Sequence, residues 1–77
     1  MNTSQKSVNL PYNYAQVEPD TGLCISCCTY SYEIPLHYYI PVPDATNDYI
    51  GKYYNFSDQL WYLTSDFSQI WADAPQW

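Results

Sequence analysis

The stretch YNYAQVEPDTGLCISCCTY, residues 12–30, decides the fold. It contains two runs rich in β-prone side chains, residues 12–17 and residues 23–30. The segment between them, residues 18–22, holds proline, aspartate and glycine, each of which favours a tight turn for a different stereochemical reason. The stretch therefore predicts a β-hairpin.

The following residues repeat this pattern of short β-prone runs separated by turn residues, which is typical of an antiparallel meander. Residues 35–43 include three prolines and suit an edge strand, because proline cannot donate a hydrogen bond to a neighbouring strand. Residues 49–54 and 60–64 predict a second hairpin, in which Gly51 leaves space for another backbone or ring to approach. We expect a mainly β fold, a small meander of two hairpins with a proline-rich edge segment.

The C-terminal part allows two interpretations. Residues 67–71 continue the β-prone pattern and predict a further short strand. A short helix over residues 66–73 is the alternative, because Ser65 or Asp66 can cap its first turn.

The chain is 77 residues long and predicts one small domain. Residues 1–10 are polar and without period, which predicts a flexible N-terminal arm, and residues 11–77 form a single β-rich domain. A chain this short buries only about 60% of the surface that its unfolded form exposes. We therefore expect a homo-oligomer, or a protein docked on a larger assembly.

The charge of the chain excludes some classes of partner. It has only two basic residues, both lysine, and a formal net charge of −6. Nucleic-acid binding depends on Lys and Arg that neutralise phosphates, so we expect no nucleic acid and no membrane as a partner. The N-terminus is too polar for a signal peptide, and no run reaches the roughly 18–20 apolar residues that span a bilayer. The sequence predicts a soluble protein made in a cytoplasm.

Three cysteines and the single histidine could in principle form a zinc site: Cys24, Cys27, Cys28 and His37. On a strand, however, Cys24 and Cys28 share one face and lie about 13 Å apart, whereas Cys27 points to the other face. One metal ion cannot hold all three. We therefore predict buried, reduced thiols, with no metal and no cofactor.

No catalytic constellation is recognisable. His37 stands beside two tyrosines, and no serine or cysteine lies near it in a recognised motif. A core this small also offers little room for a dry pocket. We expect no enzymatic activity.

Aromatic side chains are the strongest functional signal, because 19% of the residues are aromatic and ten are tyrosine. Neighbours on a strand face opposite ways, so one member of each adjacent pair in the second hairpin should point outward. Tyrosine and tryptophan dominate binding hot spots. We predict a surface that binds a protein partner or a cell-surface glycan, formed by Tyr53, Tyr54, Trp61, Tyr62 and Trp77.

Three short sequence segments resemble one family of proteins: YAQV followed by DTGLCI in residues 14–25, YIGKYY in residues 49–54, and LWY in residues 60–62. From Tyr14 to about Trp71 the chain is similar to small tail-associated proteins and tail-fibre end modules of bacteriophages, especially those of Gram-positive hosts. The resemblance implies a structural or receptor-contact protein of a phage tail, baseplate or fibre. It would reside in the virion, and in the host cytoplasm during assembly.

A second hypothesis comes from a different class of protein. The negative charge and the aromatic side chains together suit a phage-encoded acidic inhibitor. Such a protein would bind the basic groove of a host defence protein or of a nucleic-acid-processing protein.

Overall fold

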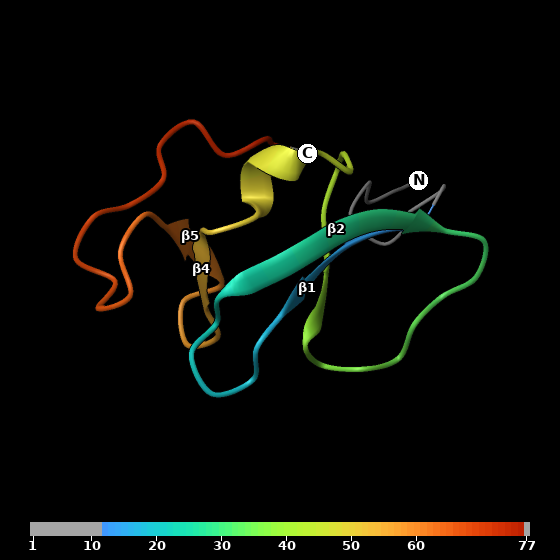
Figure 1. The fold of residues 1–77 in the computed structure, drawn as a ribbon, viewed down its shortest axis with the longest axis horizontal. Coiled ribbons are helices and arrows are strands. Elements are labelled where there is room, and N and C mark those ends of the chain that lie inside the picture. The colour runs from blue at the N-terminus through green and yellow to red at the C-terminus, as the bar shows by residue number, and fades with distance from the viewer. Residues whose placement is uncertain (1–11, 77) are drawn as a thin grey trace, which may run out of the picture.

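The computed structural model describes residues 12–76, in which short strands form two antiparallel sheets (Figure 1). The three-stranded sheet has the order β2-β1-β3, and the two-stranded sheet pairs β4 with β5. The mainly β fold is as predicted. The elements are β1 (Tyr12–Val17), β2 (Cys24–Tyr30), β3 (Tyr39–Pro41), the 3₁₀ turn η2 (Asn47–Tyr49), β4 (Tyr53–Asn55) and β5 (Leu60–Tyr62).

The first sheet is built on the predicted hairpin. Strands β1 and β2 pair antiparallel from Tyr12 opposite Tyr30 to Val17 opposite Cys24. The proline-rich segment contributes the short strand β3, which pairs with β1 and lies at the edge of the sheet. Its edge position agrees with the prediction, because Pro41 has no N–H to donate to a further strand.

A β-bulge in the hairpin changes where the cysteines point. Near the turn the register shifts by one residue, so Ile25 has no partner in β1. A bulge interrupts the alternation of side chains along a strand. Cys24 is buried, and Cys27, opposite the fully buried Ala15, also packs against the core, whereas Cys28 is exposed on the other face. The prediction that Cys24 and Cys28 share a face was therefore wrong, and so, for Cys28, was the prediction of a buried thiol.

The two sheets are joined by backbone hydrogen bonds through the β1–β2 turn. The Tyr54 N–H donates to the Gly22 carbonyl (2.8 Å). The Cys24 N–H donates to the Lys52 carbonyl (2.8 Å), and the Cys24 carbonyl accepts from the Gly51 N–H (3.0 Å). Gly22 has φ +79°, and a Cβ atom there would overlap the carbonyl oxygen of Tyr54. Around Gly51 no atom lies within 4 Å of such a Cβ. The close approach expected at Gly51 is thus found at Gly22.

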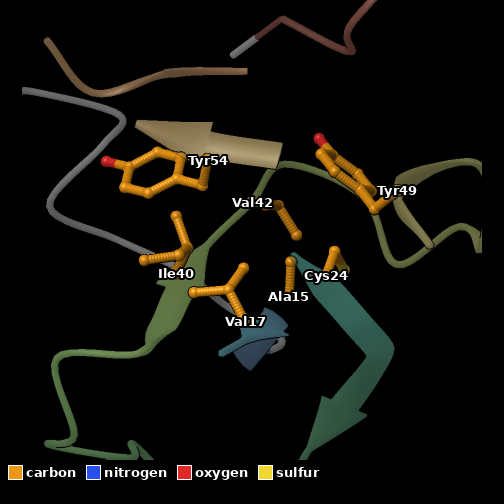
Figure 2. Packing of buried hydrophobic residues seen from close by; sticks show 7 residues of the cluster. All are labelled: Ala15, Val17, Cys24, Ile40, Val42, Tyr49 and Tyr54. Atoms are coloured by element: carbon orange, nitrogen blue, oxygen red, sulfur yellow. The ribbon is translucent and has the colours of Figure 1, made fainter. Parts of the chain in front are cut away.

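The core lies between the two sheets rather than within either one. Figure 2 shows Tyr54 and Tyr49 on one side of the cluster and Ala15, Val17 and Cys24 on the other. Tyr49 comes from η2 and is 1% exposed. Together with Ile40 and Val42, these residues make up the buried cluster.

Strands β3, β4 and β5 are all shorter than the runs 35–43, 49–54 and 60–64 that predicted them. The run 49–54 begins with the last residue of η2, so β4 starts only at Tyr53. The run 67–71 contributes a single bridge, between Ile70 and Tyr62.

The helix considered over residues 66–73 is absent, and turns occupy this segment. Asp66, one of the two residues that could have capped it, closes a tight loop instead. Its Oδ1 accepts from the Ser68 N–H, as does Thr64 Oγ1 (3.1 Å each). Phe67 has φ +58°, which a right-handed helix does not permit.

The predicted flexible arm, residues 1–10, lies outside the described residues. Across residues 12–76 the structure contains no helix with the length and apolar character needed to cross a membrane.

Candidate functional site

Most of the aromatic rings contact one another in a continuous series through the molecule. Neighbouring ring centroids lie between 5.0 and 6.2 Å apart, and most pairs are tilted or edge-to-face, the arrangements that aromatic rings prefer. Much of the aromatic content therefore stabilises the fold. The series consists of Tyr30, Tyr14, Tyr39, Tyr38, His37, Phe56, Tyr54, Trp61, Tyr49 and Trp71.

The second hairpin places its four predicted contact residues on opposite faces, as two cross-strand pairs. Tyr54 lies opposite Trp61, and both pack on the core. Tyr53 lies opposite Tyr62 on the outer face, and both are half-buried. One ring of each adjacent pair thus points away from the core, as the alternation predicted. The fifth predicted residue, Trp77, lies outside the described residues.

The outward ring of Tyr62 is held in a fixed orientation. Its hydroxyl donates to Asp58 Oδ2 (2.5 Å), and its ring centroid lies 5.3 Å from that of Phe67. The hydrogen bond to the carboxylate raises the pKa of Tyr62, so the hydroxyl stays protonated. An oriented ring loses little further freedom when a partner binds to it.

Two grooves flank this hairpin. The first, which we name the turn groove, has a volume of about 370 Å³ and lies where three chain segments meet: the β1–β2 turn, the end of β4, and the loop after β5. Its lining residues are Pro19, Asp20, Thr21, Gly22, Tyr54, Asn55, Phe56, Ser57, Ser65 and Phe67.

The charges at the turn groove are all negative. Asp20 lines it, and Asp58 and Asp66 are direct chain neighbours of lining residues. Hydrogen bonds from Ser68 and Thr64 hold the pKa of Asp66 below its ordinary value, so this carboxylate is ionised at neutral pH. Among the residues that the structure describes, no lysine or arginine contributes to the lining.

The second groove, which we name the tryptophan groove, has a volume of about 210 Å³. Trp61 and Trp71 form part of it together with Leu60 and Ile70, which are 45% and 49% exposed. The ammonium group of Lys52 lies 4.7 Å from the centroid of the Trp71 ring. The remaining lining residues are Pro43, Ala72, Ala74, Pro75 and Gln76.

The groups considered for chemistry take part in packing. Burial raises the pKa of the Cys24 thiol to about 11 and also raises that of Cys27, so both are protonated at neutral pH. The His37 ring packs between Tyr38 and Phe56. Within residues 12–76, no three His, Cys, Asp or Glu side chains form a group that could hold a metal ion.

Sequence reasoning missed the part that the two phenylalanines play. Phe56 and Phe67 are the only phenylalanines of the chain, and both stand among turn-forming residues, in NFSD (55–58) and SDFS (65–68). A large apolar side chain inside a turn has no strand face on which to be buried. That position was a signal for exposed aromatic surface, and both residues line the turn groove.

Comparison with protein-family models, with curated proteins and with solved structures finds no match to this chain.

Proposed function

We propose that this protein acts by contact, through aromatic surfaces of its second hairpin, as a structural or receptor-contact part of a phage virion. It is no enzyme in this proposal and uses no cofactor. It docks on a larger virion protein or on further copies of itself.

The observation that supports contact is the concentration of exposed apolar side chains around the second hairpin. Among residues 12–76, half of the exposed large hydrophobic side chains belong to this hairpin and the loop that follows it: Phe56, Leu60, Leu63 and Ile70, between 39% and 49% exposed. The outward pair Tyr53 and Tyr62 belongs to the same hairpin. This concentration of exposed apolar side chains on so small a domain supports a site for a partner.

The proposed location in a virion rests on the resemblance of three sequence segments, in residues 14–25, 49–54 and 60–62, to phage tail modules. Two of these segments, residues 49–54 and 60–62, contain the first two residues of β4 and the whole of β5. The proposed contact surface is thus built from the segments that carry the resemblance.

The charge favours a second candidate function, an acidic inhibitor of a host defence or nucleic-acid-processing protein. All eight acidic residues lie within residues 12–76, where Lys52 is the one basic residue. A surface of this kind would be attracted to a basic groove.

Mass spectrometry of purified virions tests the proposal. We expect the chain in the particle at a fixed ratio to the tail proteins. Its absence from virions, combined with expression early in infection, would contradict the virion proposal and support the inhibitor.

Substitution of the outward rings tests the contact surface. The double variant Tyr53→Ala with Tyr62→Ala should keep the fold but lose incorporation into virions. Leu36→Ala is the control, because it removes an exposed apolar side chain (44% exposed) from another part of the surface. Normal incorporation of the double variant would show that these rings make no contact with the partner.

A further inference from the structure

We infer that the turn groove binds an arginine side chain of a basic protein partner. This inference rests on the proposed contact function and adds the chemistry of the partner. Three observations support it: the aromatic surface of the groove, its charge, and the backbone of one of its loops.

The aromatic surface of the groove comes from rings that neighbouring rings hold in place. Phe56 is 39% exposed, and its ring packs edge-to-face on that of Tyr54, with centroids 5.2 Å apart. Phe67 is half-buried, and its ring packs against that of Tyr62. A guanidinium group is planar and stacks well on aromatic faces, and the aliphatic part of an arginine side chain can lie along an apolar wall such as Pro19.

The charge of the groove selects a cation. Asp20 lines the groove, and within residues 12–76 no hydrogen bond or ion pair engages its carboxylate. The neighbouring acids are different, because Asp58 accepts from the Tyr62 hydroxyl and Asp66 from the Ser68 N–H. Asp20 is thus the carboxylate at the groove that remains available to a guanidinium, while the other two contribute negative potential.

The backbone of the loop after β5 is strained at the residue that supplies a ring to the groove. Phe67 has φ +58°, a conformation that is unfavourable for a bulky side chain and that glycine adopts freely. The Thr64 hydroxyl oxygen fixes this loop by accepting from the N–H groups of Ser68 and Gln69 (3.1 and 3.2 Å). Unfavourable backbone conformations concentrate at binding sites. Here the chain carries phenylalanine, which supplies a ring to the groove, at a backbone position that glycine would adopt with less strain.

The aromatic surface and the charge together favour arginine over other ligands. An apolar ligand would gain nothing from the three carboxylates, and an anion would be repelled by them. A lysine ammonium would be attracted, but it is compact and strongly hydrated and stacks less well on rings.

The experiment is a titration of the ¹⁵N-labelled full chain with N-acetyl-arginine amide, followed by amide chemical shifts. The control ligand is N-acetyl-citrulline amide, which has nearly the same shape but no charge. We expect arginine amide to shift the amide signals of Gly22, Phe56 and Phe67 in a saturable manner, and citrulline amide to bind at least about 5-fold more weakly.

Two variants and a matched control locate the site. Phe67→Gly removes the ring while relieving the backbone, so it should fold normally and bind arginine amide about 3- to 5-fold more weakly. Asp20→Asn should weaken binding about 2- to 5-fold. Glu33→Gln removes the same charge from the loop after β2, which Figure 1 places far along the molecule from the β1–β2 turn, and should leave the affinity unchanged.

Equal binding of arginine and citrulline amides, or unaltered binding by Phe67→Gly, would overturn the inference. Equal weakening by Asp20→Asn and Glu33→Gln would also overturn it, because the effect would then be one of net charge. Since the titration requires no virion, a negative result would remove the arginine site alone. The contact function is judged separately by the mass spectrometry of virions.

Discussion

Replacing Gly22 with alanine should separate the two sheets. An alanine Cβ at this position would overlap the carbonyl oxygen of Tyr54 and lie 3.1 Å from its carbonyl carbon. Backbone atoms of a paired strand cannot rotate away as the end of a side chain can. To fit the methyl group, the turn must move away from β4 and lose the hydrogen bond from Tyr54 to Gly22.

The size of the effect follows from three contributions. Alanine at φ +79° costs about 1 kcal/mol, the lost hydrogen bond about 1 kcal/mol, and the overpacking about 1–3 kcal/mol. The total is about 3–5 kcal/mol. A 77-residue domain has a free energy of unfolding of about 4–12 kcal/mol, so Gly22→Ala should leave it marginally folded or unfolded.

Gly51→Ala is the matched control, because Gly51 also has a positive φ (+90°) but no atom within 4 Å of the added methyl group. It should cost only about 1 kcal/mol, equivalent to about 4–8 °C in Tm. Urea unfolding followed by tryptophan fluorescence measures both variants. Equal destabilisation by the two substitutions would refute the reasoning, because the contact with Tyr54 would then contribute nothing.

Four further predictions concern the cysteines, the alkaline limit of stability and the C-terminus. Chelators should leave the fold intact and metal analysis should find no stoichiometric zinc, whereas one zinc per chain with unfolding on chelation would show that the cysteines bind metal. Thiol labelling at pH 8 should modify the exposed Cys28 before the buried Cys24, as mass spectrometry of the labelled chain would reveal, and early labelling of Cys24 would contradict its burial. Burial raises the pKa of Cys24 from 9.0 to about 11 and also raises the pKa of Tyr49. In alkaline solution both groups therefore stay protonated in the folded chain but ionise once the chain unfolds. Stability should therefore be complete below about pH 9 and fall between pH 9 and 11, so a Tm that stays constant over this range would contradict the assignment. Truncation after Pro75, which removes Trp77, should leave Tm unchanged and weaken partner binding by about 2 kcal/mol, measured by calorimetry against the virion protein on which the chain docks.

The sequence was sufficient to predict the first hairpin and the edge strand. Both depend on local stereochemistry: the turn residues between positions 18 and 22 favour one backbone conformation each, and Pro41 lacks an N–H. Alternation also predicted that one ring of each aromatic pair in the second hairpin faces outward, and the register identifies these as Tyr53 and Tyr62. Features of this kind are encoded within a few residues of each other.

The bulge and the loop after β5 could not be predicted in the same way. Ile25 continues the alternation of β2 in the sequence, so nothing marks it as the extra residue. Asp66 can cap a helix or close a turn with the same carboxylate, and the sequence alone does not decide between the two. The turn groove is a tertiary feature, since it requires the docking of Gly22 on Tyr54, which lies 32 positions later in the chain.

The core that lies between the two sheets also affects the order in which this chain can fold during synthesis. The first hairpin leaves the ribosome complete, but Tyr49 and Tyr54, which cover one side of the core, follow it by about 20 residues. At about 5–20 residues per second, the apolar face of the hairpin stays uncovered for seconds. Strand β2, CISCCTY, carries no charge and lies at a sheet edge, so it is prone to pair with another nascent chain in that interval. The carboxylates of Glu18 and Asp20 in the adjoining turn are synthesised before it, and we expect repulsion between these carboxylates of two chains to oppose such pairing until Tyr49 and Tyr54 cover the core.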